Sequence, residues 1–291
     1  MKKPNFFLVG AAKSGTTSLA YYLSQHPDVY LSPVKEPCYF LQDIGIDDFD
    51  EYLSLFRKAG RATAIGEAST GYLFNEASAQ AILNSFPNSR IIIILRNPVS
   101  LAYSLWRYMS AHGTENLSFE EAISDLERER RRGRAFKESC AGWWCNYLYL
   151  ERALYCNQVK MYLDTFPPQQ VRIYIFEEFF DDVRQYCRDL FGFLGVDPGF
   201  KPQFRKLNEG GVPRSNFIRK LLTLKYPILR SLLPVTVRDR IRMFIKTMNI
   251  TKGNSLPLAP ETHFQLDSYF RDDITGLEKV MGRELTRWKN N

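Results

Sequence analysis

"NFFLVGAAKSGTTSLAYYLSQHP", at residues 5–27, joins an apolar run, a loop of small residues and a segment with helical periodicity. Small residues let the backbone curl, so that N–H groups converge on an anion at the N-terminus of the following helix. Lys13 lies inside this loop and not after its second glycine, where the lysine of a Walker A motif lies. The stretch therefore predicts a strand, an anion-binding loop and a helix, and it leaves open which phosphate ligand the loop holds.

Similar strand and helix patterns recur along the chain. β-branched runs that are typical of buried parallel strands lie at residues 6–10, 62–66, 91–95 and 171–176. Segments with helical spacing lie between them, at residues 16–25 and 78–85. This alternation predicts one α/β domain over residues 1–291, with a central parallel sheet flanked by helices as in P-loop NTPases.

The composition limits the classes of function. The 291 residues carry a net charge of +7, which suits an anionic ligand, an anionic substrate or nucleic acid without choosing among them. No apolar run reaches the roughly 18 residues of a membrane span, and the N-terminal apolar stretch is too short for a signal peptide, so a cytoplasmic protein is expected. The five cysteines form no CxxC pair, so inert thiols are expected and no metal site is predicted.

Two segments depart from the α/β pattern. Arginines crowd the helical segment 114–140, and the glutamates between them favour a solvated helix face over a site for an acidic partner; they are Arg128, Arg130, Arg131, Arg132 and Arg134. Residues 205–260 form a variable segment that is both basic and apolar. Contact of residues 217–250 with a membrane surface is possible, but Pro227 and Pro234 favour packed helices or an active-site lid.

The strand at 91–95 argues against a Mg²⁺-dependent triphosphatase. Such an enzyme needs an Asp at the end of this strand, and here the strand ends in Arg96, which would repel Mg²⁺ and attract a second phosphate. Ser104, on the following helix, could bind the same phosphate. Glu177 and Glu178, after the strand at 171–176, could imitate a metal-site acid, but no second carboxylate motif supports them.

Together these motifs resemble the sulfotransferases that use 3′-phosphoadenosine-5′-phosphosulfate (PAPS). "VGAAKSGTTSL" is similar to their 5′-phosphosulfate loop, and "RIIIILRNPVSLAYSLWRY" is similar to their 3′-phosphate motif. "HPDVYLSPVKEPCYF", "GEASTGYL", "FEEF" and the terminal "LEKVMGRELTRW" follow in the family's order. The resemblance covers most of the chain and is weakest over 111–140 and 215–260.

The resemblance implies a donor site that needs no metal. Lys13 would contact the phosphosulfate and stabilise charge on the bridging oxygen as the sulfuryl group leaves. The 5′-phosphate would be held by Ser14, Gly15, Thr16 and Thr17, and the 3′-phosphate by Arg96 and Ser104. Arg214 resembles a basic residue of a loop that covers the donor.

The resemblance also supplies a general base. Glu36 matches the glutamate base of the carbohydrate and tyrosyl branches, and we expect Tyr39 and Phe40 to shield it partly from water. Glu67 is a second acidic candidate, which could orient the acceptor or pair with Lys13. His112 is a weaker candidate for reaching the crevice.

The sequence departs from the heparan-type branch after Glu67. In that branch a lysine follows this glutamate, whereas here Ala68 and Ser69 do. A second catalytic cation is therefore not expected at this position, which weighs against a polysulfated sugar as acceptor.

The leading hypothesis is transfer of a sulfuryl group from PAPS to a hydroxyl or nitrogen of a small molecule, in natural product or lipid biosynthesis, leaving 3′-phosphoadenosine-5′-phosphate (PAP). The alternatives are a P-loop kinase or NTPase, and a basic polyanion-binding module without enzyme activity. A nucleic-acid partner is not expected, because no aromatic-basic stripe of the kind that binds single strands is visible. The acceptor's identity, the oligomeric state and the residues that stack on adenine cannot be predicted.

Overall fold

The computed structural model describes residues 2–42, 44–205, 212–213, 250–251 and 257–289. By its internal contacts the chain divides into two compact units. The first comprises Met1–Ala102, Leu150–Leu207 and His263–Asn291, and the second Tyr103–Tyr149 and Asn208–Thr262. The proposal that residues 1–291 act as one domain stays a prediction.

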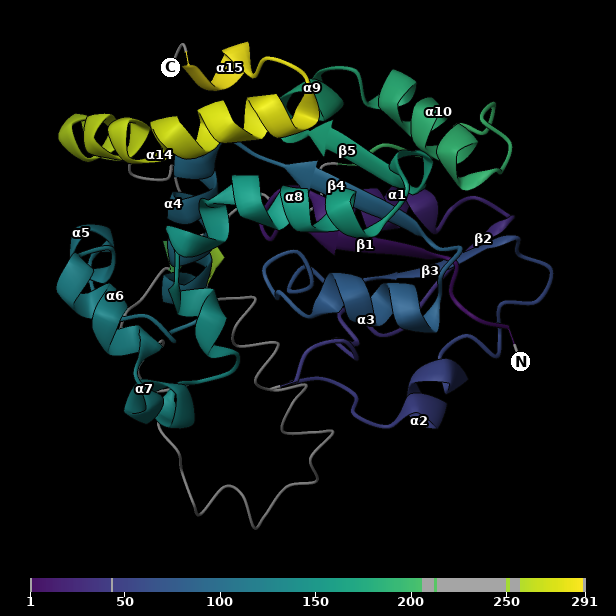
Figure 1. Cartoon of the computed structure of the whole chain (residues 1–291), viewed down its shortest axis with the longest axis horizontal. Coiled ribbons are helices and arrows are strands. Elements are labelled where there is room, and N and C mark those ends of the chain that lie inside the picture. The colour runs from purple at the N-terminus through teal and green to yellow at the C-terminus, as the bar shows by residue number, and fades with distance from the viewer. Residues whose placement is uncertain (1, 43, 206–211, 214–249, 252–256, 290–291) are drawn as a thin grey trace. The chain divides into compact units, whose positions relative to one another are not determined.

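The first unit is built on a five-stranded parallel sheet (Figure 1). Its strand order is β2-β3-β1-β4-β5, with β1 at the centre. The bounds are β1 Phe6–Gly10, β2 Val29–Leu31, β3 Ala64–Ala68, β4 Arg90–Leu95 and β5 Val171–Ile175. The predicted fold class, a central parallel sheet flanked by helices, is confirmed.

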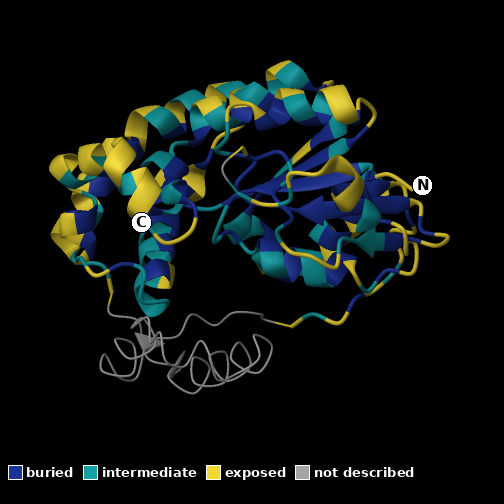
Figure 2. Ribbon diagram, turned by 90° about the horizontal axis from the view of Figure 1, so that it is seen from below, coloured by how far each residue is buried: buried dark blue, intermediate teal, exposed yellow. Residues whose placement is uncertain are grey.

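Apolar side chains cover both faces of this sheet. Figure 2 shows the strands in dark blue, the colour of buried residues, whereas the helices around them carry exposed residues. On one face α1 (Thr16–Leu23) and α10 (Val183–Leu194) pack against the strands, through a cluster that includes Phe6, Leu8, Leu19, Leu23, Ile92, Ile94, Leu190 and Phe191. The rings of Phe40 and Phe86 contact Phe7 at 5.9 and 5.7 Å between ring centroids.

One glycine of the sheet is required by close packing. A Cβ atom on Gly66 of β3 would lie 2.4 Å from the carbonyl oxygen of Phe6, which is its partner in β1. A side chain there would push the two strands apart, because real Cβ atoms do not approach so closely. The sequence "AIGEA" therefore keeps β3 against β1, and with it the residues that follow both strands.

The remaining elements of the first unit follow the sheet along the chain. They are α2 Phe49–Ser54, α3 Ser78–Ser85, η2 Glu151–Ala153, α8 Tyr155–Thr165, η3 Pro168–Gln170, α9 Phe176–Asp181, most of α14 Pro260–Met281, and α15 Thr286–Lys289. The long helix α4 (Pro98–Ala111) begins in the first unit and continues into the second. In the described part of the chain, no helix combines the length and the apolar character that crossing a membrane requires.

The second unit contains short helices, and it corrects one prediction. They are α5 Phe119–Ala122, α6 Asp125–Arg132, α7 Arg134–Ser139 and η1 Trp144–Tyr147, with a two-stranded pair of β6 Val212–Pro213 and β7 Ile250–Thr251. Arg130 is exposed as predicted. The prediction of a solvated helix face is wrong for Arg131, whose side chain is 1% exposed. Arg131 lies 2.8 Å from Glu115 and 2.7 Å from Glu127, so these carboxylates neutralise the buried guanidinium.

The predicted elements agree closely with the structure. The helix at 78–85 has the predicted bounds, the helix predicted at 16–25 ends at Leu23, and the strand predicted at 62–66 lies at Ala64–Ala68. Most of the variable segment 205–260 lies outside the described residues, as do Arg214 and nearly all of the possible membrane-contact stretch 217–250.

Candidate active site

The candidate site lies at the carboxyl edge of the sheet. In an open parallel sheet, ligands bind beyond the strand ends at the point where the order of the strands reverses. Here the connection after β1 leads to β2 on one side of the sheet, and the connection after β4 leads to β5 on the other, so this point lies between β1 and β4. The loop with Lys13 follows β1, and Arg96 follows β4.

The loop after β1 has the geometry that its small residues predict. Lys13 and Gly15 both have left-handed backbone conformations, with φ of 61° and 83°, and α1 begins directly afterwards at Thr16. A Cβ atom on Gly15 would lie 2.5 Å from the ring of Phe180, so both the backbone angle and the space require glycine. Ser14 and Thr16 are buried, whereas Thr17 is half-buried. The loop thus presents the N-terminus of α1 at the strand edge, where anions bind.

Arg96 meets this loop. Its Nη1 donates a hydrogen bond to the carbonyl oxygen of Lys13 at 3.1 Å. The guanidinium carbon lies 4.9 Å from the ring centroid of Phe176, which is the first residue of α9. Two motifs that lie 83 residues apart in the sequence therefore come together. The Arg96 guanidinium thus lies against the backbone of the loop that carries Lys13.

Both carboxylate oxygens of Glu177 accept hydrogen bonds from N–H groups of the chain. One carboxylate oxygen accepts the backbone N–H of Asn97 at 2.9 Å, and the other accepts the indole N–H of Trp288 at 3.1 Å. The described part of the chain contains no group of three or more His, Cys, Asp or Glu side chains placed to hold a metal ion. Glu177 therefore serves as a hydrogen-bond acceptor within the fold.

Glu36 lies beyond β2 and is held in place by Thr70. The Thr70 backbone N–H donates to Oε2 of Glu36 at 2.8 Å, and the Thr70 hydroxyl lies 2.9 and 3.0 Å from the two carboxylate oxygens. The Glu36 side chain remains 30% exposed, and Lys35 Nζ is 3.7 Å from it. The carboxylate is thus oriented by fixed donors and still open to a partner from solvent.

The structure adds Arg152, which the sequence did not single out. Arg152 lies on the 3₁₀ turn η2 and is 4% exposed, and its Nη2 donates to the carbonyl oxygen of Thr70 at 3.3 Å. A buried guanidinium therefore supports the residue that holds Glu36. Lone arginines carry no motif, so only the three-dimensional contact reveals this role.

Glu67 is fully buried at the end of β3. Its carboxylate accepts hydrogen bonds from the hydroxyls of Tyr52 at 2.9 Å, Tyr72 at 2.8 Å and Ser69 at 2.6 Å. Burial raises the pKa of Glu67 from 4.5 to about 7, although the three hydroxyls oppose the rise. With no exposed surface, this carboxylate cannot touch an acceptor unless the chain around it moves.

The contacts of the other predicted residues do not test the roles predicted for them. Tyr39 stacks on Tyr52 at 4.6 Å between ring centroids, and Phe40 belongs to the buried aromatic core. Ser104 lies in α4, one to two turns after its start, as predicted, in the part of the helix that belongs to the second unit. In the second unit, His112 Nδ1 lies 2.7 Å from the carbonyl oxygen of Tyr108, four residues earlier. The roles proposed for these side chains stay predictions.

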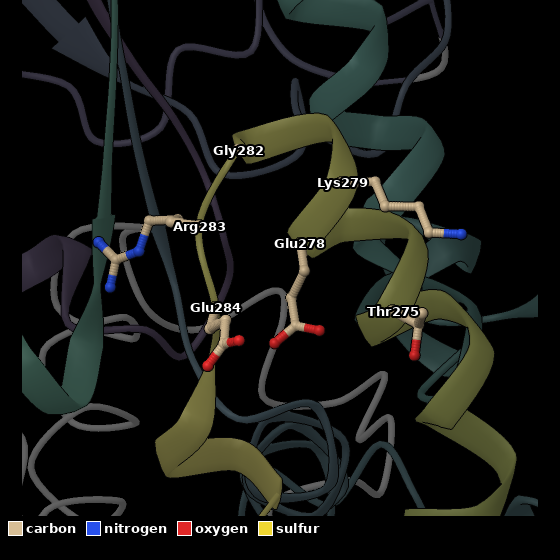
Figure 3. Close-up of a pocket in the computed structure, with 6 residues that line it drawn as sticks. All are labelled: Thr275, Glu278, Lys279, Gly282, Arg283 and Glu284. Carbon is tan, nitrogen blue, oxygen red and sulfur yellow. The ribbon is translucent and has the colours of Figure 1, made fainter.

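A surface hollow of about 300 Å³ lies beside the end of α14 (Figure 3). Its lining carries both charge signs and includes no predicted site residue; it consists of Thr275, Glu278, Lys279, Gly282, Arg283 and Glu284. Glu278 is occupied by the N–H of Leu285 at 2.6 Å and by Lys289 at 2.7 Å. The candidate active site is therefore the strand edge and not this hollow.

Comparison with known proteins identifies the family. The family model described as "Sulfotransferase domain" matches residues 3–207. The chain belongs to the sulfotransferase family. The crystal structure of a sulfotransferase from Alicyclobacillus acidocaldarius superposes with a TM-score of 0.77 at 31% identity, covering 100% of both chains. The predicted family and its α/β fold are thus confirmed.

Curated sulfotransferases match over shorter stretches. The membrane-associated sulfotransferase kil1 of Dictyostelium discoideum is 33% identical over 107 residues, which is 36% of this chain and 23% of that protein. The bifunctional heparan sulfate N-deacetylase/N-sulfotransferase 3 of Homo sapiens is 27% identical over 209 residues, which is 68% of this sulfotransferase and 23% of the human protein. The chain therefore spans less than a quarter of the length of these two relatives.

Proposed function

We propose that this sulfotransferase transfers the sulfuryl group of PAPS to a hydroxyl or nitrogen of an acceptor. The observation that carries the proposal is the contact between its two phosphate motifs, with Arg96 3.1 Å from the carbonyl oxygen of Lys13. PAPS carries a 5′-phosphosulfate and a separate 3′-phosphate on one ribose. A donor with two anionic groups matches a loop and a strand end that each present a cation at the same edge.

The donor residues divide between the two motifs. The N-terminus of α1 and the loop side chains would hold the 5′-phosphosulfate; these are Lys13, Ser14, Gly15, Thr16 and Thr17. Arg96 and Ser104 would hold the 3′-phosphate, and Arg214 would cover the donor. Under this division a cation follows β4 because the group bound there would be an anion and not a metal ion.

The transfer itself needs one cation and one base. The acceptor oxygen or nitrogen forms a bond to sulfur as the bond between sulfur and the bridging phosphate oxygen breaks. Lys13 would stabilise the negative charge that develops on this oxygen, and PAP leaves. Glu36 would take the acceptor's proton, and Thr70 supports this role because it fixes the carboxylate while 30% of the side chain stays exposed.

We propose a small molecule as acceptor. The support is the replacement of the heparan-branch lysine by Ala68 and Ser69, which leaves this position without a cation for a sulfated chain. The name of the human relative, a heparan sulfate N-sulfotransferase, keeps a polysaccharide amine as the competing acceptor class.

A labelled-sulfate assay tests the proposal and separates the acceptor classes. PAPS carrying ³⁵S is incubated with the protein and either a panel of small alcohols and amines or N-deacetylated heparan. We expect label on a small molecule, and far slower labelling when Lys13→Ala replaces the wild type. Label on the polysaccharide alone would overturn the acceptor proposal. Three results together would overturn sulfuryl transfer in favour of a kinase or NTPase. They are no label on either acceptor class, no binding of PAP, and a melting temperature that ATP with Mg²⁺ raises.

A further inference from the structure

The peptide group that joins Arg96 to Asn97 is held at both of its polar atoms. The hydroxyl of Tyr155 donates to the Arg96 carbonyl oxygen at 3.0 Å, and the Asn97 N–H donates to Glu177 Oε1 at 2.9 Å. These two bonds fix the plane of one peptide, directly after β4 ends at Leu95. The starting direction of the Arg96 side chain is therefore fixed as well.

Both partners of this peptide are linked to the C-terminal helix α15. The indole N–H of Trp288 donates to Glu177 Oε2 at 3.1 Å, and its ring lies 5.9 Å from the ring of Tyr155 between centroids. Trp288 is 3% exposed and Tyr155 is fully buried. Figure 1 shows α15 beside α9, the helix that carries Glu177. A helix of four residues near the end of the chain thus reaches the strand tip through one tryptophan.

The same helix α9 also contacts the far end of the Arg96 side chain. Phe176 lies 4.9 Å from the guanidinium carbon, and it directly precedes Glu177 in the sequence. Arg96 is consequently held at its backbone through Glu177 and at its guanidinium through Phe176 and the Lys13 carbonyl oxygen. An arginine that is ordered before binding loses less side-chain entropy when an anion arrives.

We propose that Glu177, Trp288 and Tyr155 are positioning residues, which hold Arg96 so that it recognises the 3′-phosphate of the donor. The inference rests on the proposed function, because it takes that phosphate as the ligand of Arg96. The residues act through the Arg96–Asn97 peptide and do not touch the donor themselves. Their predicted effect is on the preference for a 3′-phosphorylated nucleotide, not on nucleotide binding in general.

Glu177 offers the sharpest perturbation. Each of its oxygens accepts one N–H, and glutamine has a single acceptor oxygen on nearly the same skeleton. In Glu177→Gln one of the two bonds must therefore be lost, and an amide N–H₂ then faces an N–H donor. Trp288→Phe removes the indole donor and keeps an aromatic ring, and Tyr155→Phe removes only the hydroxyl that holds the Arg96 carbonyl group.

The experiment compares the Kd of PAP with the Kd of 5′-AMP by calorimetry, because the two nucleotides differ in the 3′-phosphate. We expect Glu177→Gln, Trp288→Phe and Tyr155→Phe each to lower the preference for PAP by roughly 5- to 10-fold, the effect of one lost hydrogen bond, while the Kd of AMP stays the same. Arg96→Gln should remove most of the preference. Lys289→Gln is the matched control, because Lys289 lies on the same helix and bonds Glu278 instead, and it should change neither Kd.

The outcomes separate the inference from the proposed function. If Arg96→Gln removes the preference but Glu177→Gln and Trp288→Phe weaken PAP and AMP equally, or weaken neither, the positioning role is wrong. If the wild type binds PAP no better than AMP, the donor assignment fails first and the inference fails with it. Should Trp288→Phe not fold, Glu177→Gln and Tyr155→Phe still decide, because both keep the packing volume.

Discussion

Replacing Glu67 with glutamine should change how the stability of this sulfotransferase depends on pH. Glu67 has no exposed surface, and burial raises its pKa from 4.5 to about 7. A carboxyl whose folded-state pKa lies above its unfolded value binds its proton more tightly when the chain is folded. Its stabilising contribution is therefore complete below pH 4.5 and is lost as the pH rises toward 7. The interval of about 2.5 pH units, at 1.36 kcal/mol each, amounts to about 3 kcal/mol.

Urea unfolding of the wild type and of Glu67→Gln between pH 4.5 and 8 measures this loss. Glutamine does not titrate, so the free energy of unfolding of the wild type should fall relative to the variant by about 3 kcal/mol over the range. Other titrating groups, such as Glu127 with its pKa lowered to about 2, are present in both proteins and cancel. The lost acceptor oxygen adds an offset of roughly 1–3 kcal/mol that does not vary with pH.

A second variant tests the cause of the pKa shift. Tyr52→Phe removes one of the hydroxyls that donate to Glu67 at less than 3 Å, and such a bond favours the charged carboxylate. The pH-dependent loss should therefore extend to higher pH than in the wild type. A difference between the wild type and Glu67→Gln that stays constant from pH 4.5 to 8 would show that burial does not hold the proton, and the reasoning would be refuted.

Substitutions of three further residues test the chemistry of the site. Lys13→Ala should lower turnover by roughly 10²–10³-fold, because one stabilising cation is lost, and should weaken PAP binding; wild-type turnover would remove Lys13 from its role. Glu36→Gln should lower kcat by roughly 10²–10⁴-fold with the Kd of PAP unchanged in calorimetry, and unchanged turnover would exclude it as the base. Arg152→Gln should loosen the contact of Thr70 to Glu36 and lower kcat roughly 10-fold, the effect of one lost hydrogen bond. The Kd of PAP should not change. Arg152→Lys should restore part of the lost kcat. The control is Arg90→Gln, which removes a similar bond, from Arg90 at the start of β4 to the carbonyl oxygen of Leu194. An equal loss of kcat in this variant would contradict the role assigned to Arg152.

The sheet could be predicted from the sequence because its strands are continuous apolar runs. A strand buried on both faces reads as such a run, and β1 and β4 do. β5 is interrupted by the exposed Arg172, but its other residues are β-branched or aromatic, which still favours a strand. β2 has only three residues, and its last two are half-buried, so its pattern is too short to define a strand. The sequence placed the start of β3 two residues early, because Ala62 and the β-branched Thr63 directly precede the strand and no turn residue separates them from it.

The site could be predicted in part, for a related reason. Lys13, Arg96 and Glu36 follow strands directly or stand in motifs with fixed spacing, so their place at the strand edge follows from the fold. Arg152 and Tyr155 belong to no such pattern, and they reach Thr70 and Arg96 from 82 and 59 residues away. Periodicity shows which face of an element is apolar, but it does not show which distant polar group a buried side chain finds.

The order of the strands also separates the charges along the edge. The two cations Lys13 and Arg96 follow β1 and β4, whereas the carboxylates Glu36 and Glu67 belong to the ends of β2 and β3 on the other side of β1. An anionic donor is attracted to the first pair and repelled by the exposed carboxylate of Glu36, so it should bind over β1 and β4. In-line transfer requires the acceptor on the side of sulfur opposite to the leaving oxygen. The acceptor should therefore approach from the β2–β3 side, where Thr70 holds Glu36. On the proposed mechanism, the place of Lys13 in the loop after β1 keeps the donor apart from the proposed base Glu36.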